Sequence, residues 1–323
     1  MDHMQDEHPG DRPVLLVLRA LGLGDLLVAV PALHALRRAY PRHRLLYAGP
    51  QWLAPALDLV GGYELLPQSG LTGGLSALPD GVGAVDIAVN LHGKGPQSTE
   101  LLSAAGPRLL MAHGGPMGGS VAGPPWVEEL HERARWTRLL QWYGVDADPL
   151  DCALRRPSSA APFPDATVVH VGAAFPSRLW PAERFAEVAR RLSDTGHQVV
   201  FTGSAGERPR AAEICALAGV PGSAVLAGRL DLQTFAACIA GSRLVISADT
   251  GAAHLASAYA RPSVILFGPV GPERWGPPPG PHRVLTRDRL RRGDPFADTP
   301  DPALLGVSVE DVLRAASELE SGH

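Results

Sequence analysis

The chain has 323 residues, which is enough for two domains of about 150 residues each. Hydrophobic residues make up 45% of it and charged residues 19%, a balance that excludes a disordered chain or a collagen-like repeat. Its formal net charge of −4 gives no overall basic field, so we expect no nucleic-acid partner.

The chain begins with MDHMQDEHPGDRP, a polar segment without the apolar stretch of a signal peptide. No later apolar run reaches the roughly 18 residues of a transmembrane helix. The three cysteines, Cys152, Cys215 and Cys238, form no CxxC pair, so neither a zinc site nor a disulfide framework is indicated. We therefore expect a soluble cytoplasmic protein.

Apolar runs alternate with helical patterns in the first half of the chain. Such alternation, with strands that are apolar on both faces, is typical of an α/β domain whose parallel sheet is covered by helices. The predicted strands span residues 14–20, 44–49, 86–91 and 108–112, and the predicted helices lie around residues 25–39, 97–105 and 128–143.

The first strand leads into a glycine-rich turn with the sequence GLGDLL. This turn lacks the third glycine of the GxGxxG fingerprint and is not a P-loop, so it matches a dinucleotide-binding motif poorly. What remains is Asp25, a carboxylate that follows Gly24 where a helix begins. Asp25 has two interpretations: a functional carboxylate beyond a strand end, or a helix-start acid favoured by the helix dipole.

The loop NLHGKGPQS, after the third predicted strand, places His92, Lys94 and Ser98 close together in the sequence. These side chains indicate either an acceptor-side wall of a transfer site or an ordinary solvated loop. We keep both interpretations, because a single histidine in a loop is not specific for either.

The proline-rich segment RRPSSAAPFP at 155–164 is the predicted linker between an N-terminal domain, 1–160, and a C-terminal domain, 161–323. A final helix is predicted at 308–320, with packing back on the first domain as one option. The second domain has predicted strands at 168–173, 198–203, 224–228, 244–248 and 263–268, and predicted helices near 182–194, 207–218, 231–240 and 251–260.

Two charged residues follow strands of the second series. Arg178 lies in the loop after residues 168–173, where a guanidinium can bind a diphosphate through two parallel hydrogen bonds. Glu207 follows residues 198–203 at the start of a helix. Each also has an ordinary interpretation, a solvated surface arginine and a glutamate in a first helical turn.

The stretch DTGAAHLA follows the buried strand LVISA. If Asp249 caps the helix, Thr250 and His254 lie four residues apart on one face, beside the first backbone amides. Gly251 lets a ligand approach the backbone closely. A helix N-terminus with these groups is a ready anion site. The alternative is an ordinary capped helix.

Five arginines occur between residues 283 and 292, in RVLTRDRLRRGDPF, and favour either phosphate binding or a solvated loop. The sequence contains no HExxH or GxSxG motif, and its one DxD triplet, at residues 146–148, follows a predicted helix rather than a strand. It therefore gives no support to zinc hydrolysis, a serine triad or a metal-bridged nucleotide-sugar site, and we expect no metal.

Three segments together resemble glycosyltransferase family 9, the ADP-heptose:lipopolysaccharide heptosyltransferases. The resemblance covers residues 14 to about 276 and implies a GT-B fold, in which two Rossmann-like parallel-sheet domains face a central cleft. The acceptor would bind the first domain and the nucleotide sugar the second. The three segments are LRALGLGDLLVAVPALHALRRAYP, SRLWPAERF and ADTGAAHLASAYARPSVILFGPVGPERWGP.

The resemblance also implies roles for single residues. Asp25 would be the general base of an inverting, metal-independent sugar transfer that needs no cofactor, and Gly24, His92 and Lys94 would lie on the acceptor side. Arg178 stands where the family has lysine, and Glu207 where it has a glutamate near the ribose. The remaining residues would hold the diphosphate of an ADP-linked donor: Asp249, Thr250, Gly251 and His254.

The chain departs from the family pattern at Ala173 and Ala174, where relatives often have small hydroxyl residues, and after residue 276, where arginines replace cysteines. The acceptor is therefore open between lipopolysaccharide, another glycan, a lipid-linked acceptor and a specialised metabolite. A lipid-linked acceptor would bring peripheral membrane contact. The alternatives to a transferase are a GT-B nucleotide-sugar epimerase, a non-catalytic nucleotide-sugar-binding protein and a nicotinamide-dependent oxidoreductase.

Overall fold

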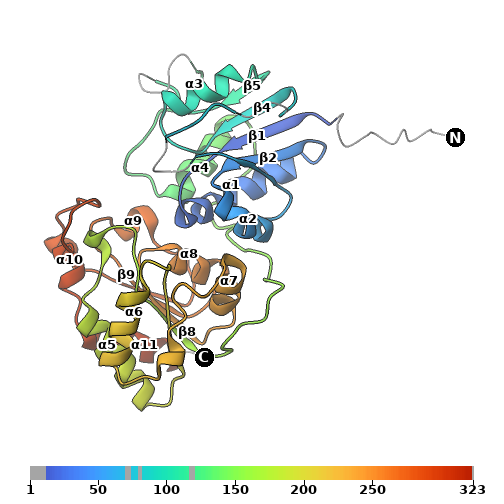
Figure 1. Ribbon diagram of the computed structural model, residues 1–323. Coiled ribbons are helices and arrows are strands. Elements are labelled where there is room, and N and C mark those ends of the chain that lie inside the picture. Colours follow the sequence, from blue (N-terminus) through green and yellow to red (C-terminus); the bar gives the residue numbers. More distant parts are fainter. Residues whose placement is uncertain (1–11, 70–73, 79–81, 116–120, 322–323) are drawn as a thin grey trace. The chain divides into compact units, whose positions relative to one another are not determined.

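The computed structural model describes residues 12–69, 74–78, 82–115 and 121–321, so most of the polar N-terminal segment lies outside the described residues. The chain divides into two compact units, Met1–Cys152 and Ala153–His323. The division falls before the boundary at residue 160 that the linker composition indicated. Each unit contains one five-stranded parallel sheet with helices packed beside it (Figure 1).

The sheet of the first unit has the strand order β3-β2-β1-β4-β5. Every residue of β1 is buried, because the strand is central and apolar on both faces. The strands are β1 (Val14–Leu18), β2 (Arg44–Gly49), β3 (Glu64–Pro67), β4 (Val85–Asn90) and β5 (Leu109–Met111), and the helices are α1 (Leu23–Ala39), α2 (Ala54–Val60), α3 (Gln97–Ala104) and α4 (Glu132–Trp142), with a short 3-10 helix η1 (Gln51–Leu53).

The second sheet has the order β10-β9-β8-β6-β7. Its strands are β6 (Thr167–His170), β7 (Val199–Thr202), β8 (Leu244–Ala248), β9 (Ser263–Leu266) and β10 (His282–Leu285). Its helices are α5 (Ala182–Asp194), α6 (Arg208–Leu217), α7 (Leu232–Ala240), α8 (Gly251–Ala258), α9 (Pro272–Trp275), α10 (Pro302–Leu305) and α11 (Val309–Ser321), with 3-10 helices η2 (Pro176–Arg178), η3 (Gly222–Ala224) and η4 (Asp288–Leu290).

Both sheets confirm the predicted α/β class with two Rossmann-like parallel sheets. The predicted strand at 224–228 is wrong, because only Val225 forms a bridge, to Phe201, and the chain turns away at Gly228, whose φ is +69°. The edge strands β3 and β10 were missed, since their partly exposed residues give no continuous apolar run.

The final helix α11 packs within the second unit. Its side chains Val312, Ala315, Ala316 and Leu319 are buried in the core of that unit. The helix lies against α5, β9 and β10. The structure therefore shows α11 packed on the sheet of its own unit, where the sequence had also allowed packing on the first domain.

Each sheet has one point where the order of its strands reverses. In the first sheet this switch point lies between β1 and β4, and in the second between β6 and β8. In open parallel sheets ligands bind beyond the carboxyl ends of the strands at such a point. The residues that follow these four strands are therefore where a site is expected.

Candidate active site

In the first unit, Asp25 is the third residue of α1 and lies beyond the carboxyl end of β1. Its Oδ2 accepts a hydrogen bond from Gly22 N at 3.2 Å, and its Oδ1 lies 3.2 Å from the Arg19 guanidinium. The side chain of Asp25 is 28% exposed, whereas that of Arg19 is 1% exposed. The helix-start interpretation of Asp25 is therefore confirmed, and the carboxylate is also partly open to solvent. Its functional role stays a prediction.

Arg19 was missed by the sequence analysis and organises this site. Its guanidinium lies 4.8 Å from the centroid of the Trp136 ring and donates to Leu91 O. Its Nε donates to the backbone O of Asp25 at 2.5 Å. The signal was present in LRALGLGD, since an arginine directly follows five apolar residues of a central strand.

His92 follows β4 and lies beside the same switch point. Its Nδ1 accepts a hydrogen bond from Ala20 N at 3.2 Å, and its own backbone N donates to Asn90 Oδ1 at 3.0 Å. Burial lowers the pKa of His92, and so does the positive charge of Arg19, while Asp25 opposes the shift. A neutral imidazole with Nδ1 as acceptor carries its proton on Nε2, so it presents a donor rather than a base.

The other predicted residues of this unit have different places. Lys94 forms an ion pair of 2.8 Å with Glu128, and both side chains are well exposed. Ser98 accepts a hydrogen bond from Asn90 Nδ2 at 2.9 Å and thus supports the loop. Gly24 lies in the first turn of α1, where the backbone amides precede the helical hydrogen-bond ladder.

In the second unit, Thr250 and not Asp249 is the N-cap of α8. The Thr250 Oγ1 accepts a hydrogen bond from Ala252 N at 3.3 Å and lies 2.8 Å from Ser247 Oγ. The prediction that Asp249 caps the helix is wrong, because the amide of Asp249 still donates to Leu266 O at 3.0 Å, which extends the pairing of β8 with β9. Gly251 is therefore the first residue of the helix.

Asp249 is a buried carboxylate between two basic groups. Its Oδ2 lies 3.7 Å from Arg178 Nη1, and its Oδ1 lies 3.7 Å from His254 Nε2. His254 is also buried and packs against the Trp275 ring, with 6.0 Å between ring centroids. The structure thus brings Arg178, Asp249, Thr250 and His254 together around the N-terminus of α8.

The Arg178 side chain combines partial burial with unsatisfied hydrogen-bonding capacity. It is 26% exposed, and its buried Nε has no hydrogen-bond partner in the part of the chain that the structure describes. An unsatisfied buried donor on a cation is costly unless a ligand completes it. Together with the first amides of α8, this guanidinium forms a candidate anion site.

Glu207 lies at the same edge of the sheet, beyond β6 and β7. Its Oε2 accepts a hydrogen bond from Ser204 N at 2.6 Å. Its carboxylate occupies the space where a Cβ at Gly172 would stand, so a side chain there would require Glu207 to shift. Burial lowers the pKa of the neighbouring His170, which Glu207 opposes. Glu207 is therefore a held carboxylate rather than a mobile surface glutamate.

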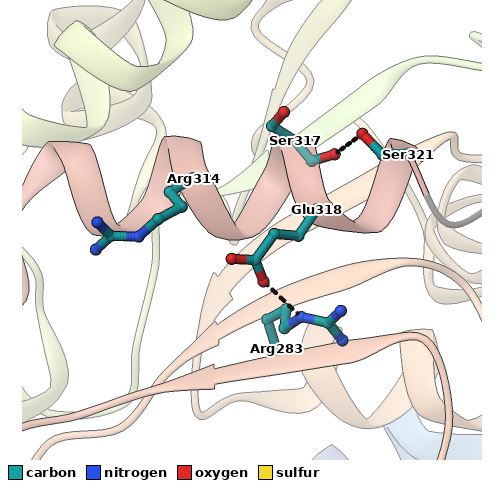
Figure 2. Close-up of a pocket in the computed structure, with 5 residues that line it drawn as sticks. All are labelled: Arg283, Arg314, Ser317, Glu318 and Ser321. Carbon is teal, nitrogen blue, oxygen red and sulfur yellow. Dashed lines mark hydrogen bonds and ion pairs between the residues drawn. The ribbon is translucent and has the colours of Figure 1, made fainter.

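Three of the five arginines between residues 283 and 292, a run that begins within β10, are engaged in ion pairs. Arg283 pairs with Glu318, Arg287 with Asp311, and Arg291 with Asp288. Arg283 and Glu318 line a hollow of about 540 Å³, formed by residues of β10 and α11, that holds none of the predicted site residues. Figure 2 shows the ion pair of these two side chains. The ordinary interpretation of this run is thus the better supported one.

Within residues 12–69, 74–78, 82–115 and 121–321 no group of three or more His, Cys, Asp and Glu side chains is placed to hold a metal ion. In the same ranges no helix has the length and apolar character needed to cross a membrane.

The sequence model of glycosyltransferase family 9 (heptosyltransferase) matches residues 147–289. Over 156 residues the chain is 33% identical to lipopolysaccharide heptosyltransferase 2 of Escherichia coli, a match that covers 46% of this chain and 44% of the relative. Over 159 residues it is 36% identical to lipopolysaccharide heptosyltransferase 1 of Pseudomonas aeruginosa, covering 49% and 40%. The chain thus spans less than half the length of these relatives.

Several solved structures match nearly the whole chain, among them the following two. The ADP-heptose LPS heptosyltransferase II of E. coli has a TM-score of 0.75 at 21% identity and covers 96% of this chain and 99% of its own. A family 9 glycosyltransferase from Veillonella parvula has a TM-score of 0.78 at 19% identity and covers 98% and 99%. These likenesses confirm the predicted fold, and the sequence matches confirm the resemblance to family 9.

Proposed function

We propose that this chain, similar to glycosyltransferase family 9, transfers a heptose or related sugar from an ADP-activated donor to a hydroxyl of an acceptor. The observation that carries the proposal is the group of Arg178, Asp249 and His254 around the Thr250-capped end of α8. This group suits the diphosphate of a nucleotide sugar. It also lies entirely inside the matched residues 147–289.

In the proposed reaction the leaving group is a nucleoside diphosphate. The bond between the anomeric carbon and the diphosphate oxygen breaks, and the electron pair remains on that oxygen. The developing negative charge is stabilised by Arg178, the first amides of α8 and the Thr250 hydroxyl. We propose that this stabilisation needs no metal ion. His254 lies against Asp249 and, when protonated, adds a further positive charge.

Asp25 is the proposed general base. Its carboxylate takes the proton of the acceptor hydroxyl as the oxygen of that hydroxyl attacks the anomeric carbon from the face opposite the leaving group, so the configuration inverts. Arg19 holds the carboxylate through Oδ1, which fixes its orientation while the side chain remains open to solvent. A positioned base of this kind contributes about 10² to 10⁴ in rate.

The acceptor is proposed by chemical class. The curated relatives are named lipopolysaccharide or lipooligosaccharide heptosyltransferases, which favours a glycan or lipid-linked acceptor with a free sugar hydroxyl. We assign its binding to the first unit, with His92 donating a hydrogen bond through Nε2. With a lipid-linked acceptor, the protein would work in the cytoplasm at the membrane surface.

Nucleotide binding tests the donor assignment. Isothermal titration of ADP, UDP, GDP, TDP and CDP, with EDTA present, should give the tightest binding for ADP. Arg178→Ala should weaken it about tenfold or more, since it removes charge-assisted hydrogen bonds. Arg283→Ala is the matched control, because it removes an arginine of the same unit that lies in the ion-paired run.

The outcomes separate the alternatives. If only Arg283→Ala weakens binding, the arginine run is the phosphate site and the present assignment fails. If no nucleotide binds, the donor site itself is refuted. Conversion of the nucleotide sugar without an acceptor would identify an epimerase, and binding without any turnover would identify a non-catalytic protein.

A further inference from the structure

The loop that carries Arg178 is fastened to a distant segment of the same unit, residues 295–301, which we call the strap. Ser177 is fully buried and engages the strap with all of its polar groups. Its Oγ donates to Pro295 O at 2.6 Å, its N donates to Ala297 O at 3.1 Å, and its O accepts from Asp301 N at 3.0 Å.

The strap is itself well anchored. The buried Asp301 accepts hydrogen bonds at Oδ2 from Arg292 N and Gly293 N, and at Oδ1 from Ala303 N, which caps α10. These bonds fix the strap to the segment before it and to the helix after it. The end of the strap at Asp301, which donates to Ser177 O, is therefore held by three hydrogen bonds of its own.

A second contact ties the same loop to the strap. Phe175, two residues before Ser177, meets Phe296 edge to face, with 4.9 Å between ring centroids and 89° between ring planes. The backbone just before Arg178 is thus held by an aromatic contact and by hydrogen bonds. Residues 175–178 cannot shift without breaking one of these.

This support matters because the guanidinium itself is weakly held. The Nε of Arg178 has no hydrogen-bond partner among the described residues, and its Nη1 stands 3.7 Å from Asp249. The place of the guanidinium therefore depends on the backbone of η2. Ala173 and Ala174, on the other side of Phe175, have no hydroxyls with which to fix the loop.

We propose that Ser177 is a positioning residue, which through the strap holds Arg178 in place for the diphosphate before the ligand binds. The proposal rests on the donor site proposed above and explains how that site is preorganised. A loop already held in its bound conformation loses less entropy on binding, so the hydroxyl of Ser177 contributes to affinity without touching the ligand.

The test is a double-mutant cycle on ADP binding with Ser177→Ala and Arg178→Ala. Ser177→Ala should weaken ADP binding about threefold to tenfold, in line with the loss of one buried hydrogen bond. In the Arg178→Ala background the same substitution should have less than about a twofold effect, because no guanidinium remains to be positioned.

Ser242→Ala is the matched control. Ser242 is also fully buried in the second unit, and its Oγ donates to Ile239 O at 2.7 Å. It lies before the amino end of β8, whereas the candidate site lies beyond the carboxyl ends of the strands. It should leave ADP affinity unchanged. Hydrogen–deuterium exchange of residues 175–179 without ligand should become faster in Ser177→Ala and stay unchanged in Ser242→Ala.

Two results would overturn the positioning role alone: wild-type ADP affinity in Ser177→Ala beside weakened binding in Arg178→Ala, or effects that multiply fully in the double variant. Unchanged exchange in Ser177→Ala would show that the strap does not hold the loop. A wild-type protein that binds no nucleotide would refute the donor site and this role within it, whatever the exchange shows.

Discussion

Single residues beyond the carboxyl ends of the strands are held in place by buried partners. Asp25 keeps one oriented, solvent-open carboxylate because Arg19 is fixed from three sides, by Leu91 O, by the Asp25 backbone and by the Trp136 ring. Glu207 keeps its place because Gly172 leaves room for it. In both cases the position of the predicted site residue depends on a neighbour that the sequence analysis did not single out.

Arg19→Lys tests the support of Asp25. A lysine keeps the charge but cannot donate in three directions from a planar group, so we expect a loss of about 1–3 kcal/mol in the free energy of unfolding. Urea denaturation measures it. Arg38→Lys is the control, since the exposed ion pair of Arg38 with Asp151 should contribute less than about 1 kcal/mol. Equal losses in the two variants would contradict the account.

Gly172→Ala tests the space around Glu207. The added methyl group forces the Glu207 carboxylate to shift, so we expect a loss below about 1 kcal/mol in the free energy of unfolding and weaker ADP binding. Gly222→Ala is the control, because a Cβ there meets nothing within 4 Å. In a Glu207→Ala background the cost of Gly172→Ala should largely vanish. A cost that persists would show that the clash lies elsewhere.

At the scale of elements, the carboxyl ends and the amino ends of the strands in the first sheet carry different kinds of residue. Arg19, Asp25 and His92 lie beyond the carboxyl ends of β1 and β4. Arg19 donates a hydrogen bond to Asp25, and the amide of Ala20 donates one to His92. The amino ends of the neighbouring strands are joined by Asp86, which accepts from Arg108 Nε at 2.7 Å and pairs with His43 Nε2 at 2.9 Å. The carboxyl ends therefore carry the candidate site residues, and the ion pairs of Asp86 link the amino ends.

The stabilisation that the Asp86 ion pairs provide should depend on pH. Hydrogen bonds from Arg108 and His43 lower the pKa of Asp86 from 3.8 to about 2. Because the folded-state pKa is depressed, the stabilisation is present above about pH 4 and is lost as the pH falls towards 2. The difference in unfolding free energy between wild type and Asp86→Asn should shrink over that range. A difference that is constant from pH 6 to pH 2 would contradict this.

At the scale of the whole molecule, the sequence predicted both sheets from their buried apolar strands, because central parallel strands read as continuous apolar runs. It missed β3 and β10, whose partly exposed edges lack that pattern, and α2, which is short. The places of the candidate site residues beyond strand ends were predictable from the sequence, while their roles stay predictions. The roles of Arg19, Ser177 and Thr250 were not, since they depend on backbone partners that only the folded chain supplies.

The most direct test of the central claim is sugar transfer by wild type and by Asp25→Asn, with ADP-heptose, a lipopolysaccharide-type acceptor and EDTA, followed by mass spectrometry of the product. Asparagine keeps the size of the side chain and an oxygen for the helix cap. We expect wild type to form glycosylated acceptor and ADP, and Asp25→Asn to be slower by about 10² to 10⁴ with ADP affinity within about twofold of wild type. Sugar transfer by Asp25→Asn at the wild-type rate would contradict the role of Asp25. If wild type transferred no sugar to any acceptor class, the proposed function itself would be contradicted.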